Sequence, residues 1–199
     1  MVDGKLRINE TFLSLQGEGH FTGTPAFFLR FSGCNLRCSF CDTQHQSFTE
    51  MTEEDIVREA SCHKPRHIVI TGGEPALQLT QSLVDRLHKA GFFIQVETNG
   101  TLPLPKDIDW VTCSPKDSLH PSLEGSGYPH ELKVLFMGDG SDPESILTSL
   151  SLRPRLYLQP LDTGNEERNR AIVRSCIAYI LEHPWWSLSL QTHKLLEIK

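Results

Sequence analysis

The chain has 199 residues, of which 38% are hydrophobic and 22% charged, a composition typical of a globular protein with a buried core. The formal net charge of −6 argues against a protein that binds long nucleic acids by electrostatic attraction. The sequence contains no run of 18 apolar residues that would predict a membrane span, and its length predicts a single domain over residues 1–199.

Eight apolar segments rich in β-branched and aromatic residues predict strands. They cover residues 8–14, 27–31, 67–71, 92–97, 110–113, 132–136, 156–159 and 188–191. Helical spacing predicts helices over 52–62, 77–90 and 166–182, and another that begins at Asp142-Pro143. Thr52 is the expected N-cap of the first helix, and Gly91 is expected to end the second.

Alternating strands and helices predict an α/β fold with a mostly parallel sheet and right-handed crossovers. Four helices are too few for a complete eight-fold barrel, so a partial (incomplete) TIM-like barrel or an open sheet is expected. Residues 115–129, rich in Pro, Gly and Ser, predict a loop. In such folds ligands bind at the C-terminal ends of the strands.

The N-terminus lacks the apolar segment of a secretion signal, which predicts a cytoplasmic location. In that reducing compartment cysteines serve as ligands or buried thiols more often than as disulfides. Cys34, Cys38 and Cys41 crowd into eight residues directly after the second predicted strand. The C-x3-C-x2-C spacing indicates a soft-metal centre, and three ligands on a four-iron cube leave one iron open for catalysis. A structural zinc site or merely buried thiols remain the alternatives.

The cysteine loop, with the aromatic Phe40 before its last cysteine, resembles the signature of the radical S-adenosylmethionine (SAM) superfamily. The resemblance implies a [4Fe–4S] cluster and SAM as cofactors, and cleavage of SAM to a 5′-deoxyadenosyl radical. It implies SAM contacts at Phe40, Asp42, Gly73, Glu74, Glu97, Ser114 and Lys116, and a further tentative contact at Asn99. Each motif also has a plain structural alternative. Phe40 can equally pack the loop, and Lys116 can be a solvated surface lysine. Gly-Gly-Glu-Pro at 72–75 can be an ordinary turn, and Asn99-Gly100 can be a type I′ turn.

Further segments carry a narrower resemblance over nearly the whole chain. Phe12–Gly19 (FLSLQGEG), Gly23–Arg30 (GTPAFFLR), Cys41-Asp42-Thr43, Leu158-Gln159-Pro160 and Gln191–Lys194 (QTHK) resemble the 7-carboxy-7-deazaguanine synthases of queuosine and 7-deazapurine biosynthesis. That family converts 6-carboxy-5,6,7,8-tetrahydropterin to 7-carboxy-7-deazaguanine with loss of ammonia. The resemblance implies hydrogen abstraction from C6 of the pterin, ring contraction and assistance by Mg²⁺.

The resemblance also implies roles for individual residues. Substrate contacts are expected at Leu15, Gln16, Gly17, Glu18, Arg30 and Thr71, the Mg²⁺ contact at Thr43, and tentative contacts at Gln159, His193 and the main-chain carboxylate of Lys199. A guanidinium fork such as that of Arg30 suits a carboxylate, although a surface ion pair is its plain alternative. For Thr43 the alternative is a local cap beside Asp42, and His193 and Lys194, expected at the close of the last strand, can be structural.

Two other activities remain open on the sequence. The first is an activase that installs a glycyl radical on a partner protein, since such enzymes share the cysteine loop and the Gly-Gly-Glu-Pro turn. The second is a zinc-stabilised binding module. A flavodoxin or ferredoxin is expected as electron donor, and the resemblance suggests a homodimer.

Overall fold

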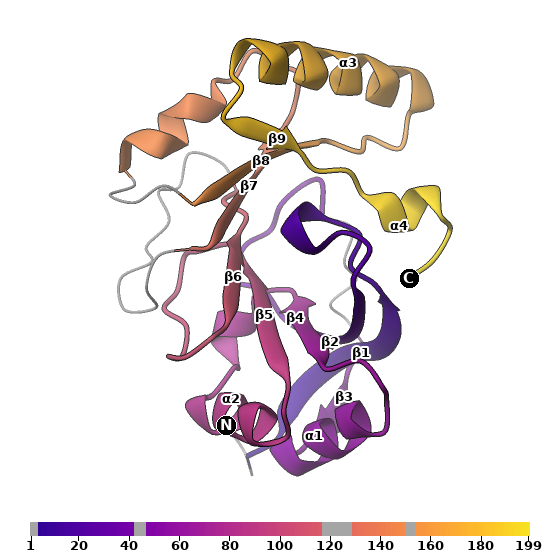
Figure 1. The fold of residues 1–199 in the computed structure, drawn as a ribbon, viewed down its shortest axis with the longest axis vertical. Coiled ribbons are helices and arrows are strands. Elements are labelled where there is room, and N and C mark those ends of the chain that lie inside the picture. Colours follow the sequence, from indigo (N-terminus) through magenta and orange to yellow (C-terminus); the bar gives the residue numbers. More distant parts are fainter. Residues whose placement is uncertain (1–3, 42–46, 117–128, 150–153) are drawn as a thin grey trace.

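The computed structural model describes residues 4–41, 47–116, 129–149 and 154–199. Nine strands form one sheet in the order β3-β1-β2-β4-β5-β6-β7-β8-β9 (Figure 1). The strands are β1 (Leu6–Leu15), β2 (Pro25–Phe31), β3 (Thr49–Met51), β4 (His67–Gly72), β5 (Phe93–Thr98), β6 (Trp110–Cys113), β7 (Glu131–Phe136), β8 (Arg155–Pro160) and β9 (Trp186–Leu188). From β2 to β9 every neighbouring pair is parallel, whereas β1 is antiparallel to both β2 and β3.

Helices cover the outer face of this curved sheet. The α-helices are α1 (Glu53–Ser61), α2 (Gln81–Lys89), α3 (Glu166–Glu182) and α4 (Thr192–Leu195), and the 3₁₀ helices are η1 (Gly19–Phe21), η2 (Pro75–Leu77) and η3 (Pro143–Ser149). One apolar core lies between α1, α2 and the outer face of β2, β4 and β5, and a second lies under α3 beside β7 and β8.

The strands bury apolar residues on their outer face, and on their inner face they carry polar residues among apolar ones such as Phe28 and Val69. Phe27, Leu29 and Phe31 of β2 belong to the outer core, whereas the alternate residue Arg30 lines an inner cavity. In β7 the outer residues Leu132 and Val134 alternate with the inward Lys133 in the same way. Buried parallel strands are usually apolar on both faces, so a polar inner face marks the interior as a binding site and not as a packed core.

The sheet stays open between its edge strands, β9 and β3, and the C-terminal segment (residues 189–199) crosses this gap beside β1. The amide of Thr192 donates to the carbonyl oxygen of Gly17 at 3.0 Å, and the side chain of Lys199 reaches Glu10 on β1 at 2.7 Å. Figure 1 shows α4 and the C-terminus beside β1 and β2. The predicted partial α/β barrel is therefore confirmed, with its lateral gap bridged by the end of the chain.

Local sequence signals explain the elements that were predicted correctly. Thr52 and Asp55 form a capping box at the start of α1, and Asn165 caps α3, whose bounds agree with the prediction. The helix expected to begin at Asp142-Pro143 begins at Pro143, as a 3₁₀ helix.

Two predicted elements need correction, and one strand was missed. The helix expected over 77–90 is instead η2 followed by α2, because the hydroxyl of Thr80 accepts a hydrogen bond from the amide of Leu83 and begins a separate helix. The strand expected over 188–191 ends at Leu188, since Gln191 turns inward to Glu18. The short strand β3 was not predicted, because three residues carry no detectable periodicity.

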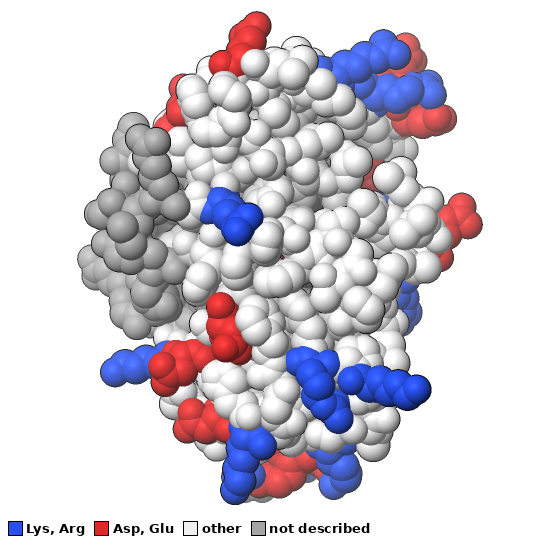
Figure 2. Space-filling model, viewed as in Figure 1, with Lys and Arg blue, Asp and Glu red and all other residues white. Residues whose placement is uncertain are grey.

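The surface carries charges of both signs. Over α1, α2 and α3, the face shown in Figure 2 has Lys and Arg side chains interspersed with Asp and Glu. None of the helices in the described ranges is long and apolar enough to cross a bilayer.

Candidate active site

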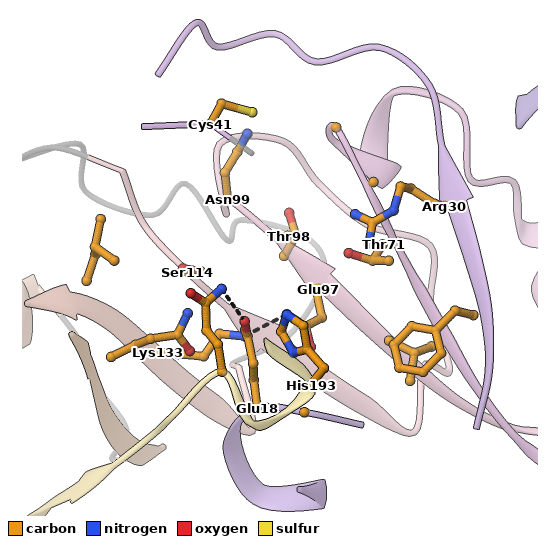
Figure 3. A pocket seen from close by; sticks show the side chains of 18 of the residues that line it. Glu18, Arg30, Cys41, Thr71, Glu97, Thr98, Asn99, Ser114, Lys133 and His193 are labelled. Carbon is orange, nitrogen blue, oxygen red and sulfur yellow. Dashed lines mark hydrogen bonds and ion pairs between the residues drawn. The ribbon is translucent and has the colours of Figure 1, made fainter. Parts of the chain in front are cut away.

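A cavity of about 300 Å³ lies inside the partial barrel, at the C-terminal ends of its strands. The cysteine loop lines one end of it and the C-terminal segment lines another part. Figure 3 shows Cys41 and Asn99 at one end, Glu18, Lys133, Glu97 and His193 at the other, and Arg30 with Thr71 along one side. Residues from the start, middle and end of the chain therefore meet in one site.

The cysteine loop leaves β2 directly and turns at Gly33, whose φ of +96° favours glycine. Within the loop, the amide of Leu36 donates to Cys34 Sγ at 3.4 Å, and the amide of Cys41 donates to the carbonyl of Cys38 at 3.2 Å. All three cysteine side chains are partly or fully accessible and line the same cavity. The fold thus presents three thiols to one enclosed space.

The arrangement of the thiols bears on the kind of metal centre. In the described part of the chain, no three His, Cys, Asp or Glu side chains converge closely enough to hold one metal ion. A single tetrahedral zinc needs its ligand atoms around one point, whereas an iron–sulfur cluster spaces its thiolates around a larger body. The three thiols that line one cavity are the soft ligands that an iron–sulfur cluster needs.

The turn after β4 packs against the start of the cysteine loop. The amide of Gly73 donates to Phe31 at 3.1 Å, and the amide of Glu74 donates to the carbonyl of Gly33 at 2.9 Å. A Cβ atom on Gly73 would lie 1.9 Å from the carbonyl oxygen of Gly33. The close approach of the two backbones therefore requires glycine at position 73, and Gly73 also lines the cavity.

Glu74 lies beneath this turn and is fully buried. Its carboxylate accepts hydrogen bonds from the Thr98 hydroxyl at 2.7 Å, the Asn99 amide at 2.8 Å and the Ala76 amide at 3.0 Å. Burial raises the pKa of this carboxyl group, although these hydrogen bonds oppose the shift. The side chain does not line the cavity, so direct contact with an ammonium group of SAM stays a prediction.

The turn after β5 is tied to the cysteine loop through side-chain amides. Asn99 Nδ2 donates to Asn35 Oδ1 at 3.0 Å, and Asn35 Nδ2 donates to the Thr101 hydroxyl at 2.8 Å. A type I′ turn needs positive φ at both central residues, and only Gly100 of the Asn99-Gly100 pair has it. The simple hairpin-turn interpretation of this motif is therefore wrong.

A buried ion pair network forms the end of the cavity opposite Cys41. The ammonium group of Lys133 contacts carboxylate oxygens of Glu18 and Glu97, the latter at 2.7 Å, and its side chain is only 4% exposed. Gln16 Nε2 donates to Glu97 Oε1 and Gln191 Nε2 donates to Glu18 Oε1, each at 2.9 Å. These contacts link β1, β5, β7 and the C-terminal segment.

Contacts within this network shift the pKa values of Glu18 and Lys133. Burial alone would raise the pKa of Glu18, but Lys133 and the Gln191 hydrogen bond lower it to about 2. Burial would likewise lower the pKa of Lys133, and the two carboxylates outweigh it and raise that pKa. Glu18 and Lys133 therefore stay ionised around neutral pH, and the carboxylate of Glu18 can only accept hydrogen bonds.

Arg30 and Thr71 occupy paired positions on adjacent parallel strands and both line the cavity. Arg30 Nε lies 3.0 Å from Glu10 Oε1, so the ion pair considered from the sequence exists. Because the same guanidinium group lines the cavity, the ion pair does not exclude a role in binding.

The C-terminal residues reach the cavity from a short helix, although the sequence predicted a strand end there. His193 and Lys194 belong to α4 and not to the close of a strand, which corrects the prediction. A Cβ atom on Gly17 would lie 2.2 Å from His193 Nδ1, so the imidazole packs directly against the backbone of Gly17. Lys199 also lines the cavity.

The ends of β6 and β8 complete the wall. Lys116 Nζ donates to the Ser114 hydroxyl at 2.8 Å, and burial, aided by Lys133, lowers the pKa of Lys116. A freely solvated surface lysine is therefore not its role. Gln159 is buried and accepts a hydrogen bond from the Ser189 hydroxyl at 3.0 Å.

Most of the predicted residues therefore line one cavity. They are Leu15, Gln16, Gly17, Glu18, Arg30, Cys34, Cys38, Phe40, Cys41, Thr71, Gly73, Glu97, Asn99, Ser114, Lys116, Gln159, His193 and Lys199. The predicted SAM contact Asp42 and the predicted Mg²⁺ contact Thr43 lie outside the described residues. Lys133 and Gln191 were missed: Lys133 stands alone in an apolar strand, and that isolated charge was the available signal.

A partial α/β barrel with a three-cysteine loop opening into its cavity defines a radical SAM protein. The chain belongs to the Radical SAM superfamily, whose family model matches residues 29–152.

Within this superfamily, the chain belongs to the 7-carboxy-7-deazaguanine synthases. It is 47% identical to the 7-carboxy-7-deazaguanine synthase of Bacteroides thetaiotaomicron, over 97% of this chain and 98% of the relative. It is 39% identical to the synthase of Caulobacter vibrioides, with 95% and 97% covered. The crystal structure of QueE from Escherichia coli superposes with a TM-score of 0.73 at 30% identity, covering 94% of this chain and 93% of the other.

Proposed function

We propose that this protein converts 6-carboxy-5,6,7,8-tetrahydropterin to 7-carboxy-7-deazaguanine and ammonia. The observation that carries the proposal is that the three cysteine thiols share one cavity with Arg30 and with the ionised end formed by Lys133. Substrate and products balance with ammonia as the only co-product, so the conversion needs no net oxidant.

The cofactors of the superfamily fit the residues present. Cys34, Cys38 and Cys41 would hold a [4Fe–4S] cluster, and SAM would lie beside it against Gly73, Asn99, Ser114 and Lys116, which line the same cavity. When bound, the reduced cluster and SAM supply a radical that abstracts a hydrogen atom, in this case from C6 of the pterin before its ring contracts. The protein's own contribution is to bind, orient and enclose the reactants.

Two regions of the cavity suit the two ends of the substrate. Arg30 offers a guanidinium group to the substrate carboxylate, beside the Thr71 hydroxyl. Gln16, Gly17 and the ionised carboxylate of Glu18 suit the N–H donors of the heterocycle at the end of the cavity opposite Cys41 (Figure 3). This placement supports a pterin that spans the cavity.

Several finer features belong to the same proposal. Mg²⁺ would bind at Thr43, because the ion prefers oxygen ligands and accepts water and substrate oxygens for the rest. The enzyme would work as a homodimer in the cytoplasm, where thiols stay reduced, with a flavodoxin or ferredoxin as electron donor. One sheet that runs from Leu6 to Leu188 supports a single domain over residues 1–199.

Product identification tests the function directly. Anaerobically reconstituted and reduced protein, given SAM and the carboxytetrahydropterin, should yield a product lighter than the pterin by one ammonia, measured by mass spectrometry. Turnover that appears only with a large protein partner would contradict the proposal and favour the glycyl-radical activase.

A pair of cysteine variants separates cluster binding from general damage. Cys38→Ser should abolish binding of about four irons per chain, whereas Cys62→Ser should leave it unchanged, because Cys62 is exposed and does not line the cavity. Equal iron contents in the two variants, or zinc in place of iron, would contradict the cluster assignment.

A further inference from the structure

We propose that Glu10 is a positioning residue that holds Arg30 and the C-terminal Lys199 at the rim of the cavity, in the arrangement that receives the substrate carboxylate. The identity of that substrate rests on the proposed function. The hold of Glu10 on the two cations rests on contacts within this chain alone.

Glu10 bridges two cations from distant parts of the sequence. It lies on β1 with Arg30 of β2 as its partner across the antiparallel pair. Its Oε1 atom is 3.0 Å from Arg30 Nε, and its Oε2 atom is 2.7 Å from Lys199 Nζ. Each carboxylate oxygen therefore binds one cation, and removing the negative charge would leave two neighbouring positive groups without their common partner.

Lys199 runs along the inner face of β1 and contacts three alternate residues. The Ser14 hydroxyl donates to the main-chain oxygen of Lys199, and the ammonium group lies 5.3 Å from the centre of the Phe12 ring before reaching Glu10. Alternate residues of a strand share one face, so the last residue of the chain is held lengthwise on a single strand. Phe12 is in turn stacked on Phe28 with ring centres 4.8 Å apart.

The contact with Glu10 also fixes how Arg30 is presented. A guanidinium group is planar with five donors in a fixed fork, so a bond to Nε sets the directions of the other nitrogens. Burial alone would raise the pKa of Glu10, but Lys199 and Arg30 together lower it, so the bridge is ionised at neutral pH. Glu10 thereby orients a cavity-lining cation without lining the cavity itself.

The first test measures the hold on the chain end without any turnover. A carboxypeptidase specific for C-terminal basic residues should release Lys199 about three- to tenfold faster from Glu10→Gln than from the wild type. Glu50→Gln is the matched control, because Glu50 forms an exposed pair with Lys5, 3.8 Å away and just before β1. Equal release rates in the wild type and Glu10→Gln would overturn the proposal.

The second test separates positioning from general stability. Glu10→Gln should raise KM for the pterin about three- to tenfold, with a smaller change in kcat and an unchanged KM for SAM, while Glu10→Asp restores part of the loss. Because Glu10 is partly exposed, the melting temperature should stay near that of the wild type. An unchanged KM for the pterin, or an equal rise in Glu50→Gln, would overturn the proposal.

The two tests distinguish a failure of this proposal from a failure of the proposed function. If the wild type forms no deazaguanine, the proposed function is wrong, and the release of Lys199 alone decides whether Glu10 holds the chain end. If the wild type is active and Glu10→Gln behaves as the wild type in either test, only the role of Glu10 is wrong.

Discussion

At the scale of single residues, the most consequential side chain is Lys133, a buried cation between apolar neighbours in β7. It is stable there because two carboxylates, Glu18 and Glu97, surround its ammonium group. Removing one partner from a buried ion pair leaves an uncompensated charge in a poorly solvated place, which costs far more than the pair itself contributes. Lys133 therefore supports both the fold and the ionised end of the cavity.

Lys133→Met should destabilise the protein by about 3–5 kcal/mol, because two carboxylates become buried without a cation. The free energy of unfolding in urea measures this loss. Lys194→Met is the control: its pair with Asp162 at 2.8 Å is more than one third exposed on both sides, so its loss should stay below about 1 kcal/mol. Similar losses in the two variants would contradict the role given to Lys133.

At the scale of elements, the turn after β4 and the cysteine loop after β2 form one unit. Parallel pairing of these adjacent strands brings their C-terminal ends together, and main-chain hydrogen bonds from Gly73 and Glu74 join the two turns. The turn after β5 adds the contact between Asn99 and Asn35. The cysteine loop is thus held by two neighbouring strand ends, and its shape does not depend on its own residues alone.

Gly73→Ala should displace the cysteine loop, because the new Cβ atom would lie 1.9 Å from the backbone of Gly33. The expected result is a strong loss of iron after reconstitution, measured by iron analysis and visible absorbance. Gly91→Ala serves as control: it strains a positive φ of +83° but meets no atom within 4 Å, and it lies far along the chain from the loop. Full iron binding by Gly73→Ala would show that the close approach is dispensable.

At the scale of the whole molecule, the free energy of unfolding depends on pH through buried groups whose pKa values are shifted by folding. Glu131 at the start of β7 is almost fully buried, and burial, aided by Glu97, raises its pKa to about 7, although the His20 amide and Lys133 oppose the shift. Between its ordinary pKa of 4.5 and about 7, the folded state binds a proton that the unfolded state has lost. Its contribution to stability is therefore present at low pH and is lost as the pH rises toward and past 7.

Glu131→Gln should remove this dependence, since the amide resembles the protonated acid and can still accept the hydrogen bond from the His20 amide. Relative to the variant, the wild type should lose about 1 kcal/mol of unfolding free energy between pH 6 and pH 8. Urea unfolding of both proteins at several pH values in this range measures the difference. A difference that does not vary with pH would show that Glu131 is ionised throughout.

Local sequence patterns predicted much of this protein. The N-cap at Thr52, the helix over 166–182 and the spacing of Cys34, Cys38 and Cys41 are short-range signals, and each is visible in the structure at its expected place. Alternation of strands and helices predicted a partial barrel or an open α/β sheet, and the resemblance to radical SAM enzymes favoured the barrel. The resemblance of many short motifs led to the right family, because each motif is weak alone and specific in combination.

Other features were decided only by the tertiary structure. Three features depend on residues distant in sequence. They are the pairing of Lys133 with Glu18 and Glu97, the burial of Glu74 against Thr98, and the path of residues 189–199 across the open side of the sheet. By itself the sequence determined most of the helices and strands and the cysteine loop that follows β2, since those are set by local backbone and capping preferences. Which side chains meet across the barrel was decided by the closure of the sheet, because contacts between distant residues exist only after the strands have found their order and register.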